Sequence, residues 1–172
     1  MNVKVRMASE MQVDSIVDGE GIRAVIWFQG CPHKCLGCHN PESHDFNAGF
    51  EMNLSDLLTQ IEQLENQSGI TLSGGEPMMQ PEASLVIVQT AKNFGMSVWC
   101  WSGFTFEELL TMSETKPIYI DLLNSIDVLV DGKFVLEKKS LNIKFRGSSN
   151  QRILDLKASM EEKRAIRLKK YK

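Results

Sequence analysis

Three cysteines stand close together in the first quarter of the chain, with the spacing Cys31-x3-Cys35-x2-Cys38. In a reducing compartment, cysteines this close together are more typical of metal binding than of disulfides. Thiolates are preferred ligands of iron–sulfur clusters, and three from one short loop could hold three corners of a [4Fe–4S] cluster. The fourth iron would then lack a protein ligand, and an open coordination position lets a metal site bind a substrate.

The alternative is a structural zinc site. Its fourth ligand would be one of the histidines or the remaining cysteine, namely His33, His39, His44 or Cys100. No second Cys-x-x-Cys pair follows the first, as it does in many zinc sites. Cys100 lies in an alternating apolar segment, which is typical of a small buried thiol. The spacing therefore favours iron–sulfur and leaves zinc open, and we expect His33 and His44 on the loop surface.

Three further polar turns could contribute to the same site: Gly74-Gly75-Glu76-Pro77, Ser102-Gly103 and Asp131-Gly132. Glycines have no Cβ, so a ligand can approach their backbone closely. A carboxylate such as Glu76 can accept charge-assisted hydrogen bonds from an ammonium group. Each turn also has a plain structural interpretation, because Gly, Ser, Asp and Pro are common where strands lead into helices.

The segments between these turns alternate between two periodicities. Runs of β-branched and aromatic residues predict strands at 24–29, 69–73, 97–101 and 127–130. Apolar residues at helical spacing predict helices at 54–64, 82–94, 106–112 and 118–125. This alternation indicates βαβ units and a mostly parallel sheet, in which ligands bind beyond the carboxyl ends of the strands. The turns all follow predicted strands, so we expect one sheet edge to bring them together with the cysteine loop.

Length and composition are those of one globular domain. The chain has 172 residues, of which 42% are hydrophobic and 24% charged. A chain of this length is too short for a complete eightfold (βα) barrel. We expect an α/β fold, either a small incomplete (βα) barrel or an open, mostly parallel sheet. No apolar run is long enough to span a bilayer, and the first residues lack the apolar stretch of a secretory signal. These features predict a cytoplasmic protein without membrane contact.

The net charge of −3 is unevenly distributed along the chain. Residues 163–172 hold six Lys and Arg and no acid, which leaves 13 bases against 22 acids elsewhere. An acidic body is not typical of a nucleic-acid binder, whose folded domain carries a basic face. We expect one domain over residues 1–158 and a basic C-terminal tail over 159–172, the tail being a frayed, solvated helix end.

Several strings of residues resemble those of a known family. The cysteine spacing after a first strand is similar to the signature of radical S-adenosylmethionine (SAM) enzymes. Three strings resemble the activases of glycyl radical enzymes: DGEGIR at 18–23, FQGC at 28–31 and CHN at 38–40. Four later strings are similar to the branch that activates anaerobic ribonucleoside-triphosphate reductase: SGGEP at 73–77, WSGF at 101–104, VDGKF at 130–134 and RGSSNQ at 146–151.

This resemblance covers residues 14–151 and implies a radical SAM fold and a reaction. Cys31, Cys35 and Cys38 would hold a [4Fe–4S] cluster that cleaves SAM reductively. The resulting 5′-deoxyadenosyl radical would generate a glycyl radical on the reductase, with a one-electron donor such as flavodoxin. The alternatives are an activase of another glycyl radical enzyme, such as a formate-lyase type, and a zinc-braced binding module.

The resemblance also implies residues for the second cofactor, SAM. Glu76 would accept hydrogen bonds from the ammonium of its methionine part. In many radical SAM loops an aromatic residue precedes the third cysteine, whereas here that position is Gly37. The full set of implied SAM contacts is Gly37, Cys38, His39, Gly74, Gly75, Glu76, Ser102 and Asp131.

Overall fold

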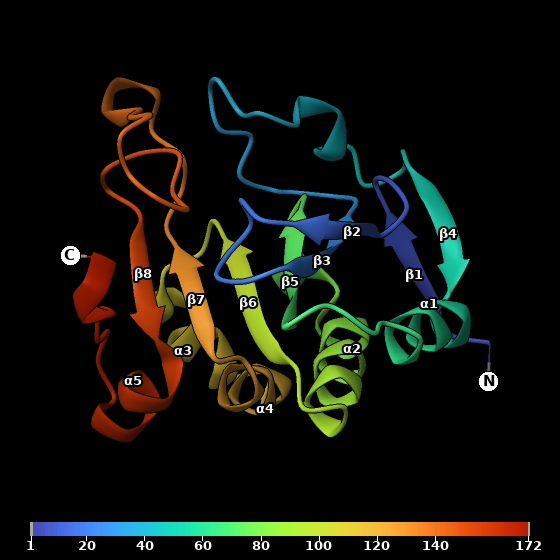
Figure 1. Cartoon of the computed structure of the whole chain (residues 1–172). Coiled ribbons are helices and arrows are strands. Elements are labelled where there is room, and N and C mark those ends of the chain that lie inside the picture. Colours follow the sequence, from blue (N-terminus) through green and yellow to red (C-terminus); the bar gives the residue numbers. More distant parts are fainter. Residues whose placement is uncertain (1, 172) are drawn as a thin grey trace.

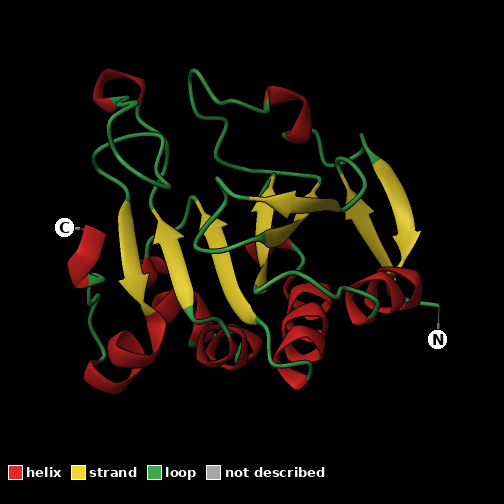
Figure 2. Ribbon diagram, viewed as in Figure 1, coloured by secondary structure: helices red, strands yellow, loops and turns green. Residues whose placement is uncertain are grey.

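The computed structural model describes residues 2–171, whose strands form one mixed sheet of eight. The strands are β1 (Lys4–Met7), β2 (Gln12–Ser15), β3 (Arg23–Phe28), β4 (Phe50–Asn53), β5 (Gly69–Gly74), β6 (Ser97–Ser102), β7 (Val128–Asp131) and β8 (Arg152–Asp155). The α-helices are α1 (Leu54–Glu62), α2 (Pro81–Asn93), α3 (Phe106–Ser113), α4 (Ile118–Ser125) and α5 (Leu156–Glu162). The α-helices gather on one side of the sheet, and the long loops, with short 3-10 turns in them, stand at its upper edge (Figures 1 and 2).

Four parallel strands form the centre of the sheet, in the order β3-β5-β6-β7. Each connection between them passes through one or two helices, as expected for βαβ units. Every predicted strand and helix is present, within a few residues of the expected bounds. The α/β prediction with a largely parallel central sheet is therefore confirmed.

The outer strands are antiparallel to their neighbours and were not predicted. β1 and β2 both pair with β3, β4 pairs with β1, and β8 closes the opposite side against β7. Each has four residues, and β2 is mostly exposed while β4 has no fully buried residue. Strands this short and this exposed carry too little periodicity to be read from sequence.

The two faces of the central strands have different environments. On β6, Val98 and Cys100 face the helices and belong to the main apolar core. Trp99 faces the other way and packs with Val130 and Ile153, together with the half-buried Trp101. Side chains alternate along a strand, so each strand contributes to both layers. The second layer lies beneath the loops that carry the predicted site.

Residues 159–171 of the basic tail are packed against the sheet, which contradicts the expectation of a frayed, solvated helix end; Lys172 lies outside the described residues. The helix α5 ends at Glu162, and the chain then returns along β8 with hydrogen bonds from Asp155 N to Ile166 O and from Leu168 N to Ile153 O, both 2.9 Å. Tyr171 packs edge-on to Trp99, with ring centroids 6.4 Å apart. Apolar side chains between the basic residues hold the segment in place. The prediction of a solvated tail considered only the charged residues and not these apolar ones.

Within residues 2–171, none of the helices combines the length and the apolar character needed to cross a bilayer.

Candidate functional site

The cysteine loop leaves the end of β3 through Gly30. This glycine has φ +99°, and a Cβ there would come within 2.6 Å of the Phe46 ring. Hydrogen bonds from Gly30 N to Ser43 O (2.8 Å) and from Cys31 N to His44 O (3.1 Å) close the base of the loop. The three cysteines are thereby held above the carboxyl ends of the parallel strands.

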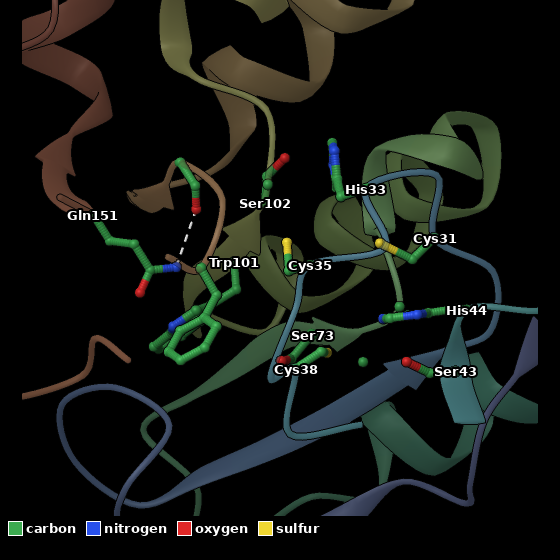
Figure 3. A pocket seen from close by; sticks show the side chains of 15 residues that line it. Cys31, His33, Cys35, Cys38, Ser43, His44, Ser73, Trp101, Ser102 and Gln151 are labelled. Carbon is green, nitrogen blue, oxygen red and sulfur yellow. Dashed lines mark hydrogen bonds between the residues drawn. The ribbon is translucent and has the colours of Figure 1, made fainter. Parts of the chain in front are cut away.

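All three cysteines line one cavity of about 110 Å³ at this edge (Figure 3). Its other walls come from the ends of the neighbouring parallel strands, as the topology predicts. The predicted residues that line it are Cys31, Cys35, Cys38, Gly74, Gly75 and Ser102. Residues as far apart in sequence as Cys31 and Ser102 thus share one site.

The three thiols differ in exposure. Cys31 is buried, whereas Cys35 and Cys38 are half-exposed. Burial raises the pKa of Cys31 to about 11, and the nearby negative charge of Glu76 adds to the effect. Metal binding requires the thiolate, so binding of iron at Cys31 releases the thiol proton.

The donor set fits an iron–sulfur cluster: three free thiols from one loop face a shared space that a cluster could fill. Cys100 lines neither this cavity nor the one beside it, and complete burial raises its thiol pKa well above the usual value. Within residues 2–171 no three His, Cys, Asp or Glu side chains surround a single metal-ion position.

A second cavity of about 510 Å³ adjoins the first, and six residues line both: Cys38, Ser73, Gly74, Trp101, Phe134 and Gln151. His39, Phe134 and Arg146 line this larger space. Its volume falls within the range of about 300–1,000 Å³ that is usual for small-molecule sites. The pair of cavities can therefore hold a metal cluster with an organic ligand next to it.

The two glycines after β5 allow the chain to pack closely against itself. A Cβ on Gly74 would lie 2.5 Å from Phe28 N, and one on Gly75 would lie 2.5 Å from Gly30 O. Hydrogen bonds from Gly75 N to Phe28 O (2.7 Å) and from Glu76 N to Gly30 O (2.8 Å) hold this approach. The missing side chains thus make room for the end of β3, while both glycines still line the cavity.

Glu76 is fully buried and does not line either cavity. Its Oε1 accepts hydrogen bonds from Met78 N and Ser102 Oγ, both 3.0 Å. Its Oε2 accepts from Gly103 N (2.8 Å) and lies 2.8 Å from His33 Nε2. The expected contact between this carboxylate and a ligand ammonium is therefore not open in this structure.

Asp131 is also fully buried and lines neither cavity. It accepts hydrogen bonds from Phe106 N (2.8 Å) and from Arg152 Nε (2.9 Å), and Arg152 also binds Glu107. Its carboxylate thereby holds the first turn of α3 and one end of β8. Protein donors surround the Asp131 carboxylate in this structure, and its contact with SAM stays a prediction.

The remaining predicted contacts divide between the two cavities. His39 faces the larger one and lies 5.8 Å from the Phe134 ring, centroid to centroid. Gly37 lines neither, and a Cβ at this position would lie 2.9 Å from the Leu136 side chain and 3.3 Å from the Phe134 ring. Its φ of +78° accounts for a glycine at this position.

Sequence reasoning missed His33, whose side chain is 5% exposed rather than on the loop surface. It also missed Gln151 as a lining residue, although the string that contains it was noted. Gln151 Nε2 donates to Gly132 O (3.0 Å), and its Oε1 accepts from Gly147 N (2.8 Å), which joins two loops of the site (Figure 3). Nothing in the local pattern distinguishes these two polar residues from solvated ones.

Comparison with known proteins agrees with this geometry. The family described as "4Fe-4S single cluster domain" matches residues 17–154. The anaerobic ribonucleoside-triphosphate reductase-activating protein of Haemophilus influenzae is 35% identical over 146 residues, covering 79% of this chain and 89% of that protein. Those of Escherichia coli K12 (36%; 79% and 90% covered) and phage T4 (33%; 80% and 86%) are similarly related.

Among solved structures, QueE from Escherichia coli aligns with a TM-score of 0.49 and 19% identity, over 59% of this chain and 53% of that chain. The sequence relationships to the activating proteins are much closer, and each alignment covers most of both proteins. The chain therefore belongs to the family of anaerobic ribonucleoside-triphosphate reductase-activating proteins, which carry a 4Fe-4S single cluster domain.

Proposed function

We propose that this protein activates an anaerobic ribonucleoside-triphosphate reductase by reductive cleavage of SAM at a [4Fe–4S] cluster. The observation that carries the proposal is the convergence of Cys31, Cys35 and Cys38 on one cavity, with a ligand-sized cavity directly beside it. The names of the relatives supply the substrate protein.

When bound, the cluster held by Cys31, Cys35 and Cys38 would supply one electron to the SAM sulfonium, and cleavage of SAM would supply methionine and the radical that abstracts hydrogen from a glycine. The part played by the chain is to bind, orient and shield. The three thiolates hold the cluster at the cavity they share, and the strand ends fix the distance to the second cavity. Radical chemistry needs such control of position and of water.

The larger cavity is the proposed SAM site. Three of the residues predicted from sequence line this cavity and stay as candidate SAM contacts, namely Cys38, His39 and Gly74. Gly75 and Ser102 line the adjoining smaller cavity and stay as candidates for the part of SAM nearest the cluster. Trp101 and Phe134 give this space aromatic walls, which suit an adenosyl group and limit water. The parallel strands β3 to β7 and their helices would be the incomplete (βα) barrel that leaves one side open to a protein substrate.

A one-electron donor such as flavodoxin would reduce the cluster. All four cysteines are free, as suits the reducing cytoplasm, which is the proposed location. A zinc-braced binding module and an activase for another glycyl radical enzyme are the alternatives that an experiment has to separate.

The test is anaerobic reconstitution with iron and sulfide, followed by reduction and addition of SAM. We expect about four irons per chain, an EPR signal of the reduced cluster that changes with SAM, and release of 5′-deoxyadenosine. Mixing with the reductase should then give a glycyl radical signal. A colourless protein that holds zinc and ignores SAM would contradict the proposal, and SAM cleavage without that radical would point to another partner.

Cys100→Ala is the matched control for the three loop cysteines. Each of the variants Cys31→Ala, Cys35→Ala and Cys38→Ala should lose the cluster and all SAM cleavage. Cys100 lies in the helix-facing core, away from both cavities, so its alanine variant should retain the iron content and the SAM cleavage. Loss of metal in Cys100→Ala would instead support a four-ligand site that includes this residue.

A further inference from the structure

Glu76 is placed to hold the cysteine loop and not to reach a ligand in the cavity. An ionised carboxylate can accept about four hydrogen bonds. Four protein groups already surround this one, at 2.8–3.0 Å, and the side chain has no exposed surface. A ligand ammonium could bind only by displacing one of them and leaving a buried donor unpaired, which is costly.

His33 is the partner of Glu76 on the cysteine loop. It lies between Cys31 and Cys35, and because a carboxylate only accepts, its Nε2 donates to Oε2 over 2.8 Å. The imidazole also packs edge-on to Phe104, with ring centroids 4.5 Å apart. A Cβ on Gly103 would come within 2.3 Å of the ring, so the backbone leaves space for this histidine and no more.

The rest of the loop has few attachments. Within the described chain, residues 32–37 make one hydrogen bond to a group outside residues 31–38, and it is the bond from His33 to Glu76. Most residues of this segment are exposed, including Pro32, Lys34 and Leu36. A segment with so few contacts opens at low free energy unless a specific interaction holds it.

We infer that His33 and Glu76, with Ser102 Oγ and Gly103 N, form a buried latch that positions Cys31 and Cys35 for the cluster, and that the Glu76 carboxylate does not bind SAM. The inference rests on the proposed function in taking these cysteines as cluster ligands. The latch joins the cysteine loop to the ends of β5 and β6. Partners that orient metal ligands commonly change metal affinity 10- to 100-fold when they are removed.

Two substitutions of His33 separate the hydrogen bond from the shape of the side chain. His33→Leu removes the donor and keeps a side chain of similar size. His33→Gln places an amide donor near the position of Nε2 and should restore the latch. Leu36→Gln is the control in the same loop, because Leu36 is 75% exposed and takes no part in the latch.

The first measurement uses the cluster-free protein and follows alkylation of each cysteine by mass spectrometry. In His33→Leu the alkylation rate of Cys31 should rise at least tenfold. In His33→Gln and in the control Leu36→Gln this rate should stay within threefold of the wild-type rate. Cys100 is fully buried and serves as an internal reference, because its rate rises only with global unfolding. Unchanged protection of Cys31 in His33→Leu would overturn the inference.

The second measurement uses the iron-loaded protein and follows iron loss to a ferrous chelator, the EPR signal of the reduced cluster, and SAM affinity. His33→Leu and Glu76→Gln should each lose iron at least tenfold faster, and the double variant should be no faster than either. A Glu76→Gln protein with wild-type cluster lifetime and weakened SAM binding would overturn the latch in favour of direct contact. If wild type binds zinc or ignores SAM, the proposed function fails, and the alkylation rates still decide the latch.

Discussion

The guanidinium of Arg23 is a point where the fold can be tested quantitatively. The residue begins β3 and is 1% exposed. Its five N–H groups make five hydrogen bonds of 2.6–3.0 Å, to Thr71 Oγ1, Glu20 O, Ile70 O, and both Oγ and O of Ser97. Arginine has five donors, so every one is used. The side chain thereby joins β3, β5, β6 and the loop before β3.

Arg23→Met keeps most of the aliphatic stem and removes all five donors. Two of the bonds, to Thr71 Oγ1 and Ile70 O, are fully buried. Each buried acceptor left without a donor costs about 1–3 kcal/mol, so these two imply a loss of about 2–6 kcal/mol in the free energy of unfolding. For a chain of this size a loss of about 4 kcal/mol lowers the thermal midpoint by about 8–16 °C.

Charge has little influence on this loss near neutral pH. Burial lowers the pKa of Arg23 to about 10, so the guanidinium is protonated in both the folded and the unfolded chain below about pH 9. The difference between wild type and Arg23→Met should therefore be constant from pH 6 to pH 8.

The assay is urea unfolding and thermal melting of the cluster-free protein under anaerobic conditions. Arg164→Met is the matched control, because the Arg164 side chain is 68% exposed and, among residues 2–171, its ion pair is with the exposed Glu162. We expect the control to change the free energy of unfolding by less than about 0.5 kcal/mol. A loss below about 1 kcal/mol in Arg23→Met would refute the assignment of this network as a structural clamp.

Two further predictions concern backbone packing and pH. Gly75→Ala should abolish stable folding or lower the free energy of unfolding by about 3 kcal/mol or more, because its Cβ would lie 2.5 Å from Gly30 O. In urea unfolding, the control Gly95→Ala should lose only about 1–2 kcal/mol, since Gly95 has φ +74° but open space around it, and equal losses in the two variants would contradict the clash. Hydrogen bonds from Arg152 lower the pKa of Glu107, so its stabilisation is present above about pH 4.5 and is lost as pH falls through the lower folded pKa. Urea midpoints should therefore drop more steeply from pH 6 to pH 3.5 in wild type than in Glu107→Gln, and parallel curves would exclude this contribution.

The central elements could be predicted because their information is local. The apolar spacing from Leu54 to Leu64 and the run from Ala24 to Phe28 each specify a period that a helix or a strand has to satisfy. The cysteine trio was equally visible, because its three ligands lie within eight residues. By contrast, β8 and the chain returning along it form through pairings that no local pattern encodes.

The roles of the polar site residues were decided by tertiary structure. Glu76 and His33 are 43 positions apart, and their contact exists because β5 and β6 end beside the cysteine loop. The same sheet register turns Asp131 toward Arg152 and the start of α3, away from the cavities. The sequence by itself determined which residues could bind a cluster and where the strands end. Only the folded sheet decided which carboxylates stay open to a ligand, because burial and partner geometry depend on packing between distant segments.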